Sequence, residues 1–310
     1  MVLFHTVDNV LEEKEYFCHQ KLFYEKDFNN IKIVNIMKLK TVKPFVSVKR
    51  IIFLLLLCAS FTFSCDKENK KINLFSIEDD IQFGKEFDQQ ILTSGEFNIV
   101  SETQYAEAYK CLNQYKDKIL ASGKVAYADK FVWKVRIIKD DATVNAFAVP
   151  GGYLYFYTGL MKTLDNEAEF VGVMAHEMAH VACRHSTNQL TKAYGIELLL
   201  SMLLGKNQNQ WVDIASGLAS GLVTLQFSRD DEFEADKHAV IYTYPTAWDA
   251  RGVSDFFKKM GSQNPVPVFL STHPSNEKRI EKVKEEWKKL GGKQGEYFED
   301  LYAHFKSILP

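Results

Sequence analysis

The sequence lacks the features that mark nucleic-acid-binding and disulfide-stabilised proteins. Its 38 basic and 40 acidic residues give a net charge of −2 and form no long block of one sign, so we expect no nucleic-acid partner. Five cysteines are too few and too irregularly spaced for a disulfide framework or a cysteine-ligated zinc site. With 46% hydrophobic and 25% charged residues, the composition is that of an ordinary globular protein and excludes a disordered or coiled-coil chain.

Long apolar runs are also missing. A membrane-spanning helix needs about 20 apolar residues, whereas the run at residues 51–64 has 14 positions, of which three are Ser or Thr. Basic residues precede this run and Cys65 follows it, an order that favours an export signal over a stable span. The segment resembles a bacterial lipoprotein signal peptide, which implies that Cys65 bears a lipid anchor to a membrane. A plain secretory signal and an uncleaved anchor are the alternatives.

This leader divides the chain. Met37 stands where the basic start of such a signal would begin, and residues 1–36 show no helical or strand period. We therefore expect 1–36 to be a non-native extension, 37–64 the signal peptide, 65–75 a polar tether and 76–310 a single domain.

Hydrophobic periodicity in this domain predicts an α+β fold that is mainly helical. The segment 131–138 alternates apolar and charged residues, which predicts a strand with one buried face. Asp165 is the expected N-cap of one long helix that ends near Leu190. The same patterns predict helices near 77–92, 102–120, 254–260, 275–289 and 296–308, two or three helices before Tyr242, and strands near 144–149 and 153–157.

A metal-binding pattern, His176-Glu177-Met178-Ala179-His180, lies within the expected long helix. Residues four apart lie on one helical face, so His176 and His180 can reach one metal ion. Glu177 beside them can address a water molecule on that ion. The alternative is a pair of helix histidines with structural partners.

A third ligand is needed, because a catalytic zinc ion takes three protein ligands and keeps one position open. The acidic segment 228–236 offers Glu232 and Asp236 on one helical face. One carboxylate could bind the metal, and the other could accept the second ring N–H of a ligand histidine. Glu234 is a competing ligand, and a solvated acidic helix face is the alternative for the whole segment.

These motifs together resemble the gluzincin metallopeptidases of the CAAX prenyl-protease, HtpX and mitochondrial OMA type. The resemblance covers about residues 76–288 and implies a zincin-like domain with a small β-sheet whose edge strand binds substrate. The blocks that match occur in this order: Asn145-Ala146-Phe147 with Pro150-Gly151-Gly152 and Gly159-Leu160, then His176-Glu177-x-x-His180, then Glu232-x-x-x-Asp236, then His273-Pro274 with Arg279.

The resemblance implies that His176, His180 and Glu232 bind one zinc ion per chain and that Glu177 is the general base. Zinc in such a site lowers the pKa of a water molecule and polarises the scissile carbonyl. The implied activity is therefore zinc-dependent hydrolysis of peptide bonds.

The remaining positions receive their roles from the same resemblance. Asp236 would hold a ligand histidine, and Arg279 would order the site. His273 would lie close to the zinc, where it either stabilises the oxyanion or gates the open coordination position. The strand that contains Asn145, Ala146 and Phe147 would bind the substrate backbone by β-augmentation.

The expected protein is a lipid-anchored endopeptidase of the cell envelope, on the periplasmic face, that cleaves misfolded or assembling envelope proteins. The alternative is a lipid-anchored envelope chaperone or scaffold whose zinc site is gated or silent. Cys183 lies near the face of the expected helix that bears the histidines, where we expect it to pack as a small apolar residue and not to compete for the metal.

Overall fold

The computed structural model describes residues 72–203, 226–274 and 277–310. The expected extension, the signal peptide, Cys65 and most of the tether lie outside these ranges. All described residues belong to one compact unit. No helix among its described residues combines the length and apolarity that a bilayer span requires.

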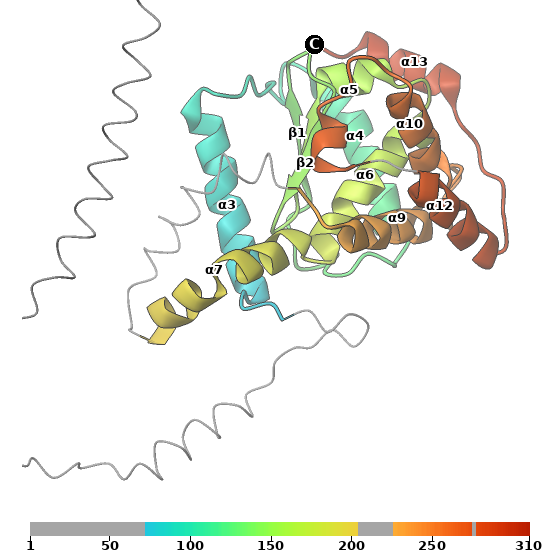
Figure 1. Cartoon of the computed structure of the whole chain (residues 1–310). Helices are drawn as coiled ribbons and strands as arrows, with labels where there is room; N and C mark the ends of the chain where they lie inside the picture. Colours follow the sequence, from blue (N-terminus) through green and yellow to red (C-terminus); the bar gives the residue numbers. More distant parts are fainter. Residues whose placement is uncertain (1–71, 204–225, 275–276) are drawn as a thin grey trace, which may run out of the picture. The chain divides into compact units, whose positions relative to one another are not determined.

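A small mixed sheet lies at the centre of the described chain (Figure 1). It consists of β1 (Lys134–Ile138), β2 (Ala146–Val149) and β3 (Tyr153–Tyr157), in the order β1-β3-β2. β1 is parallel to β3, and β2 is antiparallel to it, with Phe147 opposite Tyr155. β2 is therefore an edge strand of this sheet.

Helices make up most of the rest, which confirms the predicted α+β class with a mainly helical domain. The first, α3 (Ile77–Ser94), begins with a capping box in which Ser76 and Asp79 bind each other's backbone N–H groups. The other helices are α4 (Ala106–Leu120), α5 (Thr158–Thr163), α6 (Glu167–Ala182), α7 (His185–Leu203), α9 (Arg229–Thr243), α10 (Gly252–Gly261), α11 (Phe269–Thr272), α12 (Glu277–Lys289) and α13 (Glu299–Ser307).

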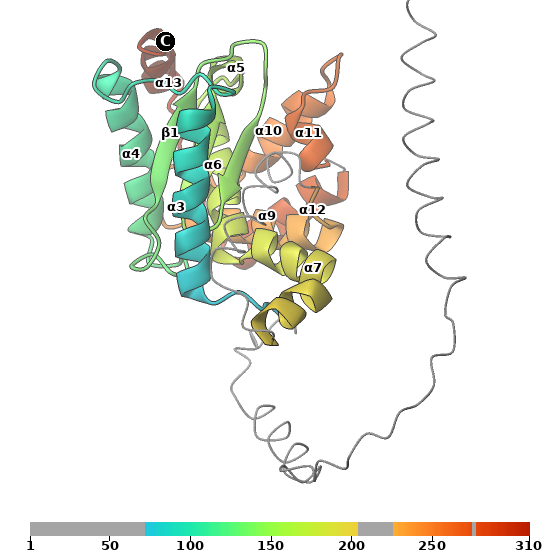
Figure 2. The same ribbon diagram turned by 90° about the vertical axis from the view of Figure 1, so that its left-hand side faces the viewer.

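Helices cover both faces of the sheet. α3 lies against one face (Figure 2), where Phe87 packs edge-on against Tyr155. On the opposite face, Phe156 packs against Phe170 of α6 at a ring-centroid distance of 5.1 Å. The side chains of β3 therefore alternate between two apolar layers, and all five residues of that strand are buried.

The predicted exposed face of β1 is wrong, because α3 covers it. Arg136 is buried, and its guanidinium forms two hydrogen bonds to Asp88 of α3, at 2.9 and 2.6 Å. Asp88 also accepts a hydrogen bond from the Tyr155 hydroxyl at 2.9 Å. A charged residue in the strand pattern thus marks a buried ion pair between sheet and helix instead of a solvated face.

The predicted long helix from Asn166 to Leu190 is also wrong in detail. Its N-cap is Asn166, whose side chain accepts a hydrogen bond from the backbone N–H of Glu169, and not Asp165. The helix ends at Ala182, and Arg184 adopts a left-handed backbone conformation with φ of 56°. A new helix, α7, begins at His185 in a different direction (Figure 1).

Two glycines allow α6 and α10 to pack at close range. A Cβ atom on Gly172 would lie 2.4 Å from the backbone nitrogen of Val253, and one on Gly252 would lie 2.0 Å from the carbonyl oxygen of Ala168. Both distances are far below van der Waals contact, so neither position accommodates a side chain without separating the helices. This packing fixes α6, the helix that contains the His176 to His180 pattern.

We predict that Gly172→Ala lowers the free energy of unfolding by about 1–3 kcal/mol, because the added methyl group overpacks the contact between α6 and α10. Urea denaturation measures this change. The matched control is Gly261→Ala at the end of α10, where a Cβ atom meets nothing within 4 Å. That substitution should leave stability unchanged or raise it by up to about 1 kcal/mol. Equal effects of the two substitutions would contradict the prediction.

Candidate metal centre

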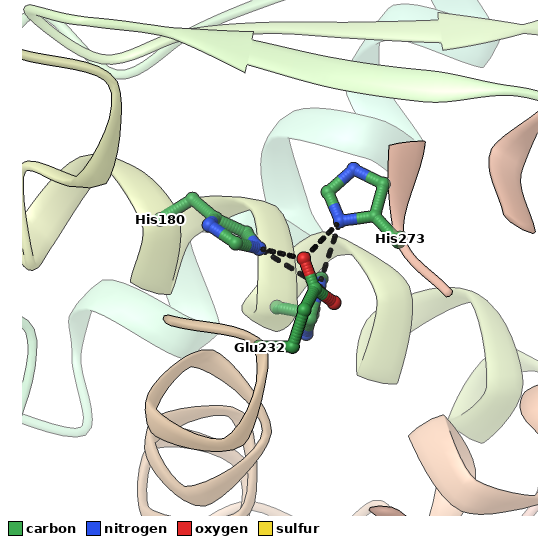
Figure 3. A group of neighbouring side chains, drawn as sticks. His180, Glu232 and His273 are labelled. Atoms are coloured by element: carbon green, nitrogen blue, oxygen red, sulfur yellow. Dashed lines mark hydrogen bonds and ion pairs between the residues drawn. The ribbon is translucent and has the colours of Figure 1, made fainter. Parts of the chain in front are cut away.

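Side chains from α6, α9 and the segment after α11 meet at one buried point (Figure 3). The Nε2 atoms of His176 and His180 lie 3.0 Å apart. The Nε2 atom of His176 lies 3.5 Å from Oε2 of Glu232, and that of His180 lies 3.5 Å from Oε1. All three side chains are at most 2% exposed, so bulk solvent has little access to them. The structure thus brings together the two predicted histidines and the predicted third ligand.

These distances fit a tetrahedral zinc ion. Ligand atoms at the usual Zn–N and Zn–O distances of about 2.0–2.2 Å lie about 3.3–3.6 Å from each other around such an ion. The observed separations, 3.0 Å between the two nitrogens and 3.5 Å from each nitrogen to one of the two Glu232 oxygens, agree with this value to within a few tenths of an ångström. Two imidazoles and a carboxylate are also a donor set that zinc prefers.

The start of α9 determines where Glu232 lies. Ser228 and Asp231 form a capping box, with the Ser228 hydroxyl 2.6 Å from an Asp231 oxygen, so the helix begins at a defined residue. Glu232 is in the first turn, and Asp236 follows one turn later on the same face. The Asp236 carboxylate lies 2.9 Å from Nδ1 of His176. It can therefore accept the proton on Nδ1 and leave Nε2 of His176 free to bind a metal.

Arg279 of α12 joins both carboxylates of α9. Its guanidinium donates two hydrogen bonds to Asp236, each 2.7 Å long, and lies 2.7 Å from an oxygen of Glu232. The same group lies over the ring of Phe257 at 3.9 Å and donates to the carbonyl oxygen of His273. Arg279 is 1% exposed. It therefore fixes α12 and the segment that contains His273 against α9.

The protonation states suit a metal. Burial is the main reason why the pKa of His180 is well below its usual value, and the neighbouring His176 lowers it further. Burial acts to raise the pKa of Glu232, but His273 and Arg279 outweigh it and the net shift is downward. The pKa of Asp236 is likewise lowered, because Arg279 outweighs the effect of burial. Neutral imidazole and ionised carboxylate are the forms that bind metal ions.

Glu177 differs from the other carboxylates of the site. Its side chain is 1% exposed, and its Oε1 atom accepts no hydrogen bond from the described residues. Burial raises the pKa of Glu177, although His273 and His176 act in the opposite direction. The Nε2 atom of His273 lies 3.5 Å from Oε1 of Glu177. A carboxylate with a raised pKa beside a metal site is suited to take up and release a proton.

His273 reaches the centre of the site. Its Nδ1 atom lies 3.3 Å from Nε2 of His176 and 3.0 Å from an oxygen of Glu232. The ring is stacked on Phe269 at a centroid distance of 4.5 Å and is 2% exposed. In Figure 3, His180 and His273 approach the Glu232 carboxylate from different sides. His273 therefore offers a fourth donor atom, and the four atoms lie within 4.8 Å of one another.

Glu234, the competing ligand candidate, lies outside the cluster around Glu232. Its carboxylate lies 3.2 Å from Nε2 of His185, and with Cys183 these residues form a second group of possible donors. Cys183 is half-buried and belongs to this group, not to the cluster around Glu232. Sequence reasoning missed His185, although a third histidine five residues after His180 was the available signal. It also missed Phe227, whose ring stacks on His180 at 4.0 Å.

The proposed substrate strand is present, but its side chains face inward. Asn145, Ala146 and Phe147 are at most 5% exposed, and Phe147 stacks on Tyr155 at a centroid distance of 4.6 Å. These exposed fractions are those of whole residues, main chain included, so in this conformation the three residues offer a polypeptide almost no contact surface.

Comparison with known proteins places this site in a family. The profile of Peptidase family M48 matches residues 112–287. The mitochondrial metalloendopeptidase OMA1 of Schizosaccharomyces pombe is 29% identical over 163 residues, which cover 50% of this chain and 46% of the relative. A putative beta-barrel assembly-enhancing protease of Vibrio cholerae is 28% identical over 186 residues, which cover 54% and 38%. The human OMA1 metalloendopeptidase is 23% identical over 227 residues, which cover 62% and 42%.

The chain thus spans less than half the length of each of these curated relatives. The family match, in contrast, covers more than half of this chain and includes the clustered residues from His176 to Arg279. It confirms the resemblance inferred from the sequence motifs and supports a metalloprotease. The chain belongs to peptidase family M48, the members of which are zinc-dependent metallopeptidases.

Proposed function

We propose that this protein is a zinc-dependent endopeptidase and that His176, His180 and Glu232 bind its single zinc ion. The observation that supports this most directly is the convergence of their donor atoms, 3.0–3.5 Å apart, at a buried point beside Glu177. Membership of the M48 family supports the same reading. Glu177 further favours an enzyme over a pure chaperone or scaffold, because a binding protein has no use for a general base.

Each nearby side chain has a proposed role in hydrolysis. When bound, zinc would supply Lewis-acid activation of a water molecule and of the scissile carbonyl. Glu177 would take a proton from the water and deliver it to the leaving amine. Asp236 would hold His176 in the tautomer that presents Nε2, and Arg279 would keep both carboxylates of α9 in place. Burial of the whole group strengthens these charge interactions.

The proposed substrates are polypeptides bound along the outer edge of β2, which pairs with no other strand of the described chain. In β-augmentation, main-chain hydrogen bonds give affinity, and the edge of β2 would have to become exposed first, because three of its four residues are buried. The bacterial relatives are named for enhancing β-barrel assembly. With the lipoprotein-like leader, this supports misfolded or assembling envelope proteins as substrates of an enzyme that is anchored through Cys65.

We predict that Glu177→Gln lowers peptidase activity by about 10²–10⁴-fold, because the general base is lost, and leaves the zinc content unchanged. His180→Ala should lose both activity and zinc. A casein-type assay with and without a chelator, combined with metal analysis, measures both quantities. Glu281→Gln, on the exposed side of α12, is the matched control and should behave as the parent. Retained proteolysis in the Glu177 variant would overturn the assignment.

The position of His273 supports a gated state of the same site. With His273 as a fourth protein donor, the coordination position that catalysis needs for water would be closed. We therefore propose that His273 gates the zinc and must withdraw before a substrate reacts. If this withdrawal never occurred, the protein would be the alternative chaperone or scaffold with a silent zinc site.

If His273 is a gate, His273→Ala should raise proteolysis several-fold while the zinc content stays the same, because the fourth position is then open. The exposed His304 of α13 provides the control substitution, His304→Ala, which should have no effect. Steady-state cleavage of a quenched fluorescent peptide measures the change. A loss of activity in His273→Ala would instead favour stabilisation of the oxyanion by His273.

The substrate class can be tested with the Glu177→Gln variant as a trap. Because it should bind substrates without cleaving them, envelope proteins should co-purify with it and accumulate in cells that produce it. Quantitative proteomics of envelope fractions, compared with those of the parent, identifies them. Equal profiles in the two strains would argue against envelope proteins as substrates.

A further inference from the structure

His180 has a partner that is itself a histidine. The Nδ1 atom of His180 lies 2.9 Å from Nδ1 of His185, on the side of the ring opposite to the metal cluster. The Nε2 atom of His185 lies 3.2 Å from an oxygen of Glu234. The rings of His180 and His185 are nearly perpendicular, with an interplanar angle of 75°, and both side chains are at most 2% exposed.

These contacts fix where the protons lie. The Glu234 carboxylate only accepts hydrogen bonds, so His185 must donate its Nε2–H to it, and Nδ1 of a neutral His185 is then an acceptor. The short contact between the two Nδ1 atoms requires one proton, which must come from His180. His180 therefore has its proton on Nδ1 and its lone pair on Nε2, the atom that faces Glu232 and His176.

We propose that His185 is a positioning residue that, together with Glu234, holds His180 in its metal-binding tautomer. His185 holds His180 as Asp236 holds His176. The difference is that the carboxylate, Glu234, reaches the ligand histidine through a second histidine. This inference rests on the proposed zinc site and adds a determinant of metal affinity outside the ligand set.

The break between α6 and α7 creates this arrangement. Arg184 turns the chain with its left-handed conformation, and its guanidinium binds Asp80 of α3 and the carbonyl oxygens of Phe75 and Ser76. A continuous helix would place His185 five residues beyond His180, on a different face. The turn instead brings the His185 ring back against His180, so the N-terminal part of the domain supports the position of a proposed ligand.

The same hydrogen bonds argue against a second metal ion at Cys183, His185 and Glu234. These three residues have donor atoms within 4.8 Å of one another. A metal at Nε2 of His185 would displace the proton that this atom donates to Glu234. His185 would then need its proton on Nδ1, directed at the protonated Nδ1 of His180. One zinc ion per chain is therefore the expected stoichiometry.

The test is the zinc affinity of the full-length chain, measured by competition with a chromophoric chelator. His185→Leu should weaken zinc binding by about 10–100-fold, as expected for loss of an outer-shell partner. His185→Asn keeps an acceptor oxygen in the place of Nδ1 and should restore most of the affinity. Glu234→Gln should weaken binding to a smaller extent, because an amide allows the other tautomer of His185. The exposed substitution Glu281→Gln is the matched control.

Visible absorption of the cobalt-substituted proteins provides a second readout, and it should change in His185→Leu but not in His185→Asn. Equal zinc affinity in His185→Leu and the parent overturns the inference, as does an equal loss in the Leu and Asn variants. If His185→Leu does not fold, an unchanged affinity in Glu234→Gln overturns it. A second equivalent of tightly bound zinc would also do so. A parent chain that binds no zinc overturns the proposed function itself.

Discussion

The buried guanidinium of Arg279 is the interaction on which the geometry of the site depends. It binds Asp236 through two hydrogen bonds and lies 2.7 Å from Glu232, so one cation fixes two carboxylates of α9. Removing one partner of such a buried group typically costs about 3–5 kcal/mol, although the intact pair adds little net stability. Its contribution is therefore one of position: Glu232 faces the histidines of α6 because Arg279 holds it there.

Much of the site could be predicted because helix spacing is local information. His176 and His180 share a face at any position in any helix, and so do Glu232 and Asp236. The pairing between these two helices is not local, and here the family resemblance was required. The structure brings the expected residues together and places Glu234 outside their cluster, a distinction that spacing alone left open because Glu232 and Glu234 lie in the same turn.

The parts that the sequence did not predict arise from tertiary contacts. The alternation at 131–138 suggested a solvated face, yet Asp88 from a distant helix neutralises Arg136 and allows it to be buried. Residues 166–190 have an uninterrupted helical pattern, yet contacts of Arg184 with Asp80 and nearby carbonyl groups accompany a break after Ala182. In both cases an arginine forms a contact with α3 that no local pattern encodes.

The donors of the cluster are far apart in the chain, and this determines when a metal can be captured. His176 and His273 are separated by 97 positions, and the carboxylate of α9 lies between them. Only two histidines are therefore in place while the chain emerges, and the full donor set forms after α9 has docked on α6. If the chain is exported unfolded, as the proposed leader implies, it would acquire zinc after translocation. The metal supply of the receiving compartment, and not that of the cytosol, would then set the fraction of loaded protein.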